Sequence, residues 1–451
     1  MWRLTLYLLL AIAPPSVSTA TTSTTGLLER EATEAFNKAD YVTVLKLWQA
    51  LPQDATPSKQ LLNLAFQSTI KLGRPEDGLL LYERAVKDNH PEDLALLRPL
   101  AMSFLSANVR DSKEHVRIAA FTALTDLGLK ESQSIFEDGL LDPSPLVRAR
   151  AAEGLGRAGL AAKSGPLRRA LQDESVPVRI AAMDALSEAR VADIAPQMVE
   201  VARKKDGPEA VFAYAALYRL GKTDMLVDIT GAATLPDPET RMAALGVLGR
   251  LKQRASLSVV SQGVYDPEPT VRAFAAGALG EFGQPGAVAP LSHALGDENA
   301  RVRGVAAASL GRIGIKDNRP LLHALTRDVS MQVRASAIEG LLRLGDQSAI
   351  LIAADLARHP DPSVRAATAH ALSVTSNKHG VSILQMLLQD QQPQPRLFAA
   401  KALGKISAPV LPILKKGLYD TDTAVRVTAA GSLLQQISRL KESSSKGGRK
   451  G

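Results

Sequence analysis

Apolar and small residues recur along most of this chain at a nearly constant separation of 31 residues. Each repeat unit has one residue at an equivalent position, which we call its register residue and from which we count offsets. The register residues are Arg117, Arg148, Arg179, Ala210, Arg241, Arg272, Arg303, Arg334, Arg365, Arg396 and Arg426. Leucine stands seven positions after every register residue, and alanine stands three positions after all but one, where Thr368 replaces it. Offsets of three and seven lie on one face of an α-helix. The pattern therefore predicts eleven helices that each bury the same stripe.

A second apolar segment precedes each of these helices. Examples are AVAPLSHAL at 287–295 and NRPLLHAL at 318–325, and a short turn such as Asp142-Pro143 separates the two segments. Such turns end one helix and begin the next. A lone helical hairpin cannot cover its apolar face, whereas a stack of hairpins can. We therefore expect an all-α fold, an α-solenoid (superhelix) of stacked antiparallel helix pairs.

An aspartate six residues before the register residue completes the pattern in eight units. These residues are Asp111, Asp142, Asp173, Asp266, Asp297, Asp328, Asp390 and Asp420. The repeat resembles the HEAT repeat, particularly the short HEAT-like variety first known from bilin lyases, in eleven units over residues 92–437. The resemblance implies that aspartate and arginine form a ladder of hydrogen bonds between successive units, which makes them structural residues.

Three units depart from this pattern. Asp206, Asp237 and Asp361 lie only four residues before their register positions, and Ala210 replaces the arginine of the fourth unit. We expect the ladder to be interrupted around residues 204–240, where the solenoid either bends or contacts another molecule.

Residues 26–91 follow a different period. Trp48 and Tyr82 lie 34 residues apart, and Gly73 stands where a turn between two helices is expected. This segment resembles a pair of tetratricopeptide units. The resemblance implies further helix pairs before the HEAT-like array.

The first 20 residues predict a signal peptide. Arg3 precedes the apolar run 4–13, and small residues lead to a cleavage site after Ala20. The alternative is an uncleaved anchor. The chain contains no cysteine, so disulfides and thiolate metal sites are excluded. We expect export to the periplasm or cell envelope, or secretion, and a flexible basic tail at residues 438–451.

Charge and residue spacing argue against several function classes. The net charge is +8, of which only about +3 remains on the folded body once the signal and tail are set aside. This balance disfavours nucleic acid and leaves membrane contact to an uncleaved N-terminus or the basic tail. His293 and His323 occupy adjacent first helices but are explained by the repeat. We identify no catalytic, cofactor or metal site.

The second helix of each pair should line the concave face of the solenoid. Offsets of two and nine from the register residue then select candidate partner-binding residues: Arg157, Phe212, Arg219, Arg250, Phe274, Arg312, Arg343, Phe398 and Lys405. Arginines and aromatic residues often anchor partners. Alternatively, the cations offset the helix dipoles and the phenylalanines only pack.

These observations predict a monomeric, non-catalytic scaffold that holds a protein or peptide partner on its concave face. The alternative is a bilin-lyase-like or other HEAT-type enzyme, or an accessory factor of an enzyme, because the family that the repeat resembles includes such proteins.

Overall fold

The computed structural model describes residues 18–51, 57–86, 93–204, 206–374 and 378–447. These residues form α-helices and short 3₁₀ turns, and no strand occurs among them. The chain divides into two compact units, residues 1–103 and 104–451. None of the helices in the described ranges is both long and apolar enough to cross a membrane.

The first unit contains four helices before α5. They are α1 (Ser18–Asn37), α2 (Tyr41–Gln49), α3 (Lys59–Lys71) and α4 (Pro75–Ala85). Helix α1 packs against α2 and α3, and α3 packs against α4. Gly73, between α3 and α4, has a φ of +65°, a conformation that favours glycine. Whether these pairs are tetratricopeptide units stays a prediction. Helix α5 (Leu94–Asn108) spans the boundary of the two units.

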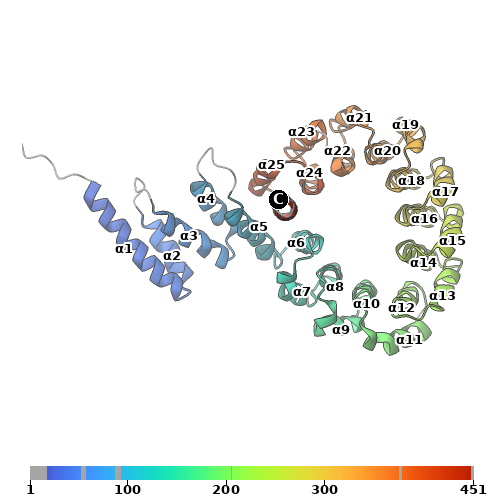
Figure 1. The fold of residues 1–451 in the computed structure, drawn as a ribbon, viewed down its shortest axis with the longest axis horizontal. Coiled ribbons are helices and arrows are strands. Elements are labelled where there is room, and N and C mark those ends of the chain that lie inside the picture. The colour runs from blue at the N-terminus through green and yellow to red at the C-terminus, as the bar shows by residue number, and fades with distance from the viewer. Residues whose placement is uncertain (1–17, 52–56, 87–92, 205, 375–377, 448–451) are drawn as a thin grey trace, which may run out of the picture. The chain divides into compact units, whose positions relative to one another are not determined.

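The second unit is built on helices that begin just before each register residue. These inner helices are α6 (Glu114–Leu127), α8 (Pro145–Arg157), α10 (Val176–Glu188), α12 (Pro208–Arg219), α14 (Pro238–Leu251), α16 (Pro269–Phe282), α18 (Ala300–Ile313), α20 (Met331–Arg343), α22 (Pro362–Ala371), α24 (Pro393–Lys405) and α26 (Thr423–Gly447). Each inner helix packs against the next (Figure 1).

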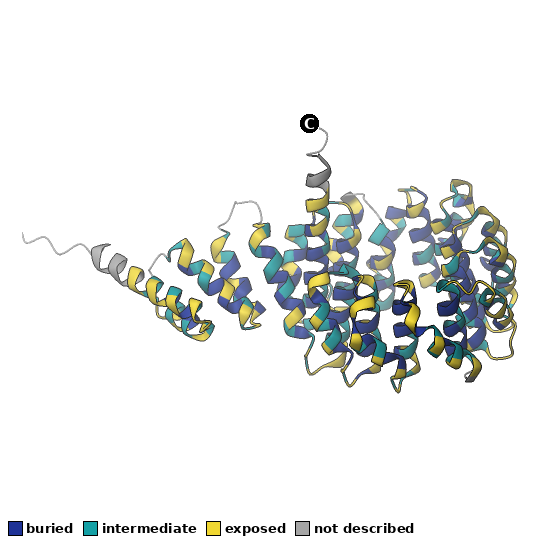
Figure 2. Ribbon diagram, turned by 60° about the horizontal axis from the view of Figure 1, so that its bottom comes forward, coloured by how far each residue is buried: buried dark blue, intermediate teal, exposed yellow. Residues whose placement is uncertain are grey.

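Shorter helices form an outer layer in the second unit. They are α7 (Gln133–Gly139), α9 (Gly165–Arg169), α11 (Ala195–Lys204), α13 (Met225–Ala232), α15 (Leu257–Gln262), α17 (Val288–Ala294), α19 (Arg319–Leu325), α21 (Ala349–Leu356), α23 (Lys378–Leu387) and α25 (Leu411–Lys416). Most of them pack on the inner helix that follows them in sequence. The buried residues lie on the faces between helices, and many exposed residues lie at the connecting turns (Figure 2).

Local chemistry explains why the inner helices start where they do. Proline occupies the first turn of several of them, where its missing N–H removes no helical hydrogen bond. The Ser144 hydroxyl caps α8 by accepting a hydrogen bond from the Val147 N–H. Leucine at offset seven is fully buried throughout, as at Leu155 and Leu310. The apolar stripe of the repeat is therefore the core of the solenoid.

Small residues allow the inner helices to approach closely. A Cβ added to Gly311 on α18 would lie 2.3 Å from the Gly340 Cα on α20, and one added to Gly249 on α14 would lie 2.8 Å from the Ala278 Cβ on α16. No side chain fits at such distances without moving a helix. These glycines are therefore needed for the spacing between repeats.

The inner helices of the second unit close into a ring. The last of them, α26, packs against the first, α6, in the same way that consecutive inner helices pack (Figure 1). A Cβ on Gly431 of α26 would lie 2.7 Å from the Ala123 Cβ of α6. The repeat predicts a solenoid, which is confirmed, but it does not predict that the two ends of the array meet. We call the α6–α26 contact the seam.

The predicted tail differs from the structure. Helix α26 continues through Gly447, although a flexible segment was predicted from residue 438. The sequence RLKESSSK contains neither proline nor glycine, so nothing in it stops a helix that has already formed. Residues 448–451 lie outside the described residues, and so does most of the predicted signal peptide, which stays a prediction.

Candidate functional site

Arginine and carboxylate residues form a ladder that joins successive units. Arg303 donates from Nε to Asp328 Oδ2 at 2.8 Å and from Nη2 to Asp328 Oδ1 at 2.9 Å. Its Nη1 also donates to the carbonyls of Asp297 and Glu298, in the turn before its own helix. The same arrangement recurs in Arg117–Asp142, Arg148–Asp173, Arg241–Asp266, Arg272–Asp297, Arg365–Asp390 and Arg396–Asp420. The predicted structural role of these residues is confirmed.

The ladder is interrupted where the register changes, but only in part. Arg179 pairs with Glu209 at 2.7 Å, so a carboxylate from α12 replaces the missing aspartate. Ala210 has no guanidinium, and the next rung begins at Arg241. Arg334 donates from Nε to the Asp328 carbonyl instead of forming a bidentate pair. The predicted gap at 204–240 is therefore one rung shorter than expected.

Four of the ladder carboxylates, Asp173, Asp297, Asp328 and Asp390, have a pKa below its usual value. Hydrogen bonds from Arg303 lower the pKa of Asp328, although burial opposes this shift. Burial also opposes the shift at Asp297 and Asp390, where the paired arginine and a backbone N–H nevertheless leave the pKa lowered. These carboxylates are therefore charged in the folded chain at neutral pH.

We expect the chain to lose stability on acidification below about pH 4. An aspartate with a lowered folded pKa contributes its stability above the unfolded pKa of about 3.9 and loses it as the pH falls through the folded pKa. Urea midpoints measured between pH 7 and pH 2.5 should stay level to about pH 5 and then fall. Asp328→Asn should make the fall shallower. Midpoints that stay level down to pH 3 would contradict this account.

The inner helices are arranged in a ring (Figure 1), and we call the side of these helices that faces the centre of the ring the lumen wall and the centre the lumen. Eleven helices whose axes lie about 9 Å apart form a ring about 32 Å across, and a helix with its side chains is about 10–12 Å wide. The opening is therefore on the order of 20 Å wide. It is wide enough for an extended peptide or a single helix.

Phe212, Arg219 and Arg250 come together on one side of the lumen. Asp184 on α10 accepts from Arg219 Nη1 at 2.9 Å and from Arg250 Nη1 at 3.0 Å. Arg250 thereby crosses the intervening helix α12, and its guanidinium carbon lies 5.4 Å from the centre of the Phe212 ring. The Arg219 side chain is only 11% exposed. Asp184 is therefore a structural partner of both Arg219 and Arg250.

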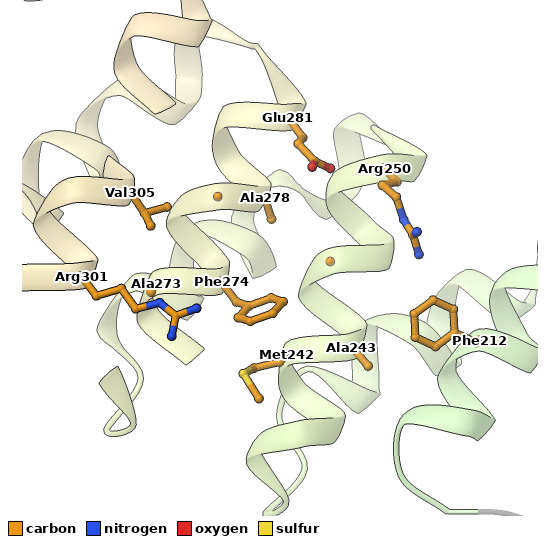
Figure 3. A pocket seen from close by; sticks show the side chains of 12 residues that line it. Phe212, Met242, Ala243, Arg250, Ala273, Phe274, Ala278, Glu281, Arg301 and Val305 are labelled. Carbon is orange, nitrogen blue, oxygen red and sulfur yellow. The ribbon is translucent and has the colours of Figure 1, made fainter. Parts of the chain in front are cut away.

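A hollow of about 420 Å³ lies in the lumen wall between α12 and α18 (Figure 3). Phe212, Arg250 and Phe274 line it, and Phe274 is 46% exposed. The sequence did not single out Met242 and Arg301, which also line the hollow. Met242 is at offset one, adjacent in sequence to offset two. Arg301 is at offset minus two, about one helical turn before offset two. A wider definition of the concave face would have included them.

Arg343, Phe398 and Lys405 gather farther along the lumen. Arg343 donates to Glu339 Oε1 at 2.9 Å, and the His370 ring lies edge-on to Phe398 at 6.3 Å. Partial desolvation and the neighbouring cations lower the pKa of His370 and of Lys405. The cluster therefore favours a neutral imidazole at pH 7.

Arg157 and Arg312 have different surroundings. Arg157 Nη1 lies 3.4 Å from Asp126 Oδ1, and Lys401 Nζ lies 3.5 Å from Asp126 Oδ2. Because Lys401 is on α24 and Asp126 is on α6, this pair crosses the seam. Arg312 extends toward α16, where its Nη1 would lie 3.0 Å from a Cβ on Gly280.

Comparison with known proteins agrees with this architecture. A family model for HEAT repeats matches residues 136–217, 259–322 and 318–392, and the matched segments contain six of the ten register arginines. The chain is a HEAT-repeat solenoid. No curated protein matches it.

Several solved structures resemble this HEAT-repeat chain at low identity. The complex of CpcE and CpcF of phycocyanin lyase from Nostoc sp. PCC7120 is 23% identical, over 46% of this chain and 94% of that chain, with a TM-score of 0.35. Human deoxyhypusine hydroxylase in complex with glycerol is 19% identical, over 56% and 99%, with a TM-score of 0.27. Kap95p, in a structure with RanGDP, is 14% identical, over 93% and 66%, with a TM-score of 0.36. At these values the neighbours say nothing about the activity or partners of this chain.

Two histidines of the HEAT repeats have separate partners. The His293 ring lies 4.6 Å from that of Tyr265, and His323 Nε2 lies 2.7 Å from Asp346 Oδ2. Hydrogen bonds from Ser348 and His323 lower the pKa of Asp346, against the effect of burial. His293 therefore interacts with a residue of the preceding unit, whereas His323 interacts with the turn that follows α20.

Proposed function

We propose that this HEAT-repeat chain is a non-catalytic, exported scaffold that holds a protein or peptide partner in its lumen. The closed ring of inner helices is the observation that carries the proposal. The predicted concave residues all belong to the inner helices of this ring, and the exposed Phe274 and Arg250 line a hollow, which supports the proposal. Export rests on the predicted signal peptide alone.

Site-specific photo-crosslinking in the native host tests this function. A benzophenone amino acid would replace Phe274 in the lumen or Leu351 on the outer helix α21, where the leucine is 75% exposed. We expect one defined covalent adduct from position 274 and none from position 351. The same adducts from both positions, or none from position 274, would contradict a lumen-bound partner.

The same preparation separates the scaffold from an enzymatic alternative. A bilin-lyase-like protein or accessory factor would copurify with a chromophore or a modified substrate. We expect the purified chain to lack visible absorption and any covalently modified small molecule. A bound chromophore would favour the alternative.

A further inference from the structure

Two glycines in the lumen wall are not explained by packing within the chain. Gly246 on α14 and Gly277 on α16 occupy the same offset, five, in neighbouring repeats. A Cβ at Gly246 would meet nothing within 4 Å, and one at Gly277 would meet only Val305 Cγ1 at 3.6 Å, an ordinary contact. Glycine weakens a helix interior relative to alanine. These two positions therefore lose helix stability without a gain in packing.

The next glycine in each helix provides the contrast. A Cβ on Gly249 would lie 2.8 Å from the Ala278 Cβ, and one on Gly280 would lie 2.5 Å from the Ser309 Oγ. Those two glycines are required for close approach between repeats. Gly246 and Gly277 instead line the hollow, as do Phe274 and Met242, whose side chains Figure 3 labels. The open space at the two glycines fits the side chain of another molecule.

The charges around this hollow are predominantly positive. Arg250 and Arg301 line it, against the single carboxylate of Glu281. Among the residues that the structure describes, Arg301 has no carboxylate within ion-pair distance, whereas Arg250 pairs with Asp184, which it shares with Arg219. The rim can therefore accept further negative charge.

We infer that the hollow between α12 and α18 binds an acidic peptide segment of the partner, with one apolar side chain seated over Gly246 and Gly277. The inference rests on the proposed function and specifies the chemistry of the partner. The apolar side chain would contact Phe274 and Met242. A flanking carboxylate would pair with Arg301, and the arginines of the lining would draw acidic segments and repel basic ones.

Selection from a random 12-residue peptide library on the purified full chain tests this inference. Peptides enriched on the wild type should carry net negative charge and a recurring apolar residue. Gly277→Leu, which fills the hollow, should weaken their binding at least tenfold, and so should Arg301→Glu. The matched control is Gly231→Leu on the outer helix α13, where an added Cβ also meets nothing within 4 Å. It should bind as the wild type does.

Three results would overturn the inference: no enrichment, enrichment of neutral or basic peptides, or equal binding to wild type and Gly277→Leu. Circular dichroism melting checks that each variant is folded. If Gly277→Leu does not fold, Arg301→Glu still tests the inference. If position 274 forms a crosslink and any of these results is also obtained, the proposed scaffold function stands, and only the inference that the partner segment is acidic is rejected.

Discussion

Asp328→Ala is expected to lower the free energy of unfolding by about 3–5 kcal/mol, the usual effect of removing one partner of a buried ion pair. The side chains of Arg303 and Asp328 are only 13% and 8% exposed. Alanine would leave the Arg303 guanidinium with two backbone carbonyls and no carboxylate. It would also remove the acceptor for the Ser330 N–H at the start of α20. Urea titration measures the loss, and hydrogen exchange should localise it to α18 and α20.

The matched control is Asp193→Ala, which removes an exposed ion pair at the same sequence separation. Arg168 Nη2 lies 3.4 Å from Asp193 Oδ2, and the Asp193 side chain is 65% exposed. Because such pairs contribute about 0–1 kcal/mol, this variant should unfold almost as the wild type does. Equal losses from both variants would show that the ladder is not a buried structural network.

A double substitution separates the two causes of the expected loss. Arg303→Met together with Asp328→Ala removes both charges, so that no unpaired guanidinium is left between α18 and α20. Replacing a buried pair with apolar groups is often close to neutral. The double variant should therefore be more stable than Asp328→Ala alone. A further loss would instead assign the stability to the ion pair itself.

The repeat made the ladder predictable because each rung depends on residues at fixed sequence offsets. A rung joins Arg303 to a carboxylate 25 residues later, and the same offsets recur unit after unit. Glu209 escaped the prediction because it belongs to the following helix. Lys204 stands where the ladder aspartate is expected, six residues before Ala210, and Glu209 pairs with Arg179 instead.

The lumen residues were less predictable because their roles depend on how far each helix rotates relative to the next. Offsets two and nine select Phe274 and Arg250, which line the hollow. They could not show that Arg219 and Arg250 share Asp184. Arg250 and Asp184 lie 66 positions apart in sequence and on helices separated by α12. Arg219 was a candidate for partner contact on sequence grounds, but in the structure it is largely buried.

Ring closure was not predictable from the repeat for a related reason. Eleven units that complete one turn rotate by about 33° each, and an error of a few degrees per unit accumulates around a solenoid. The residues at the seam contain no distinct motif, because Ala123 and Gly431 are small residues like those between several other neighbouring inner helices, such as Gly249 and Ala278. Closure is a property of the whole array.

A disulfide between Ala123→Cys and Gly431→Cys is expected to form on mild oxidation and to lock the ring. A Cβ on Gly431 would lie 2.7 Å from the Ala123 Cβ, whereas disulfides need about 3.5–4.5 Å, so the seam must widen by about 1 Å. The native chain has no cysteine, and the introduced pair is therefore unambiguous. Intact-mass measurement after alkylation, together with faster migration on non-reducing gels, reports the bond.

The locked ring should also unfold at higher denaturant concentration, because the bond closes a loop of about 300 residues. Loop-closure entropy gives an upper limit of about 6 kcal/mol, and strain at the seam reduces it. Ala123→Cys with Gly231→Cys is the control, since Gly231 lies on the outer helix α13, and its two thiols should stay free within one chain. Free thiols in the Ala123→Cys and Gly431→Cys chain would mean that α6 and α26 are apart in solution. The lumen would then be an open groove that a partner can enter from the side.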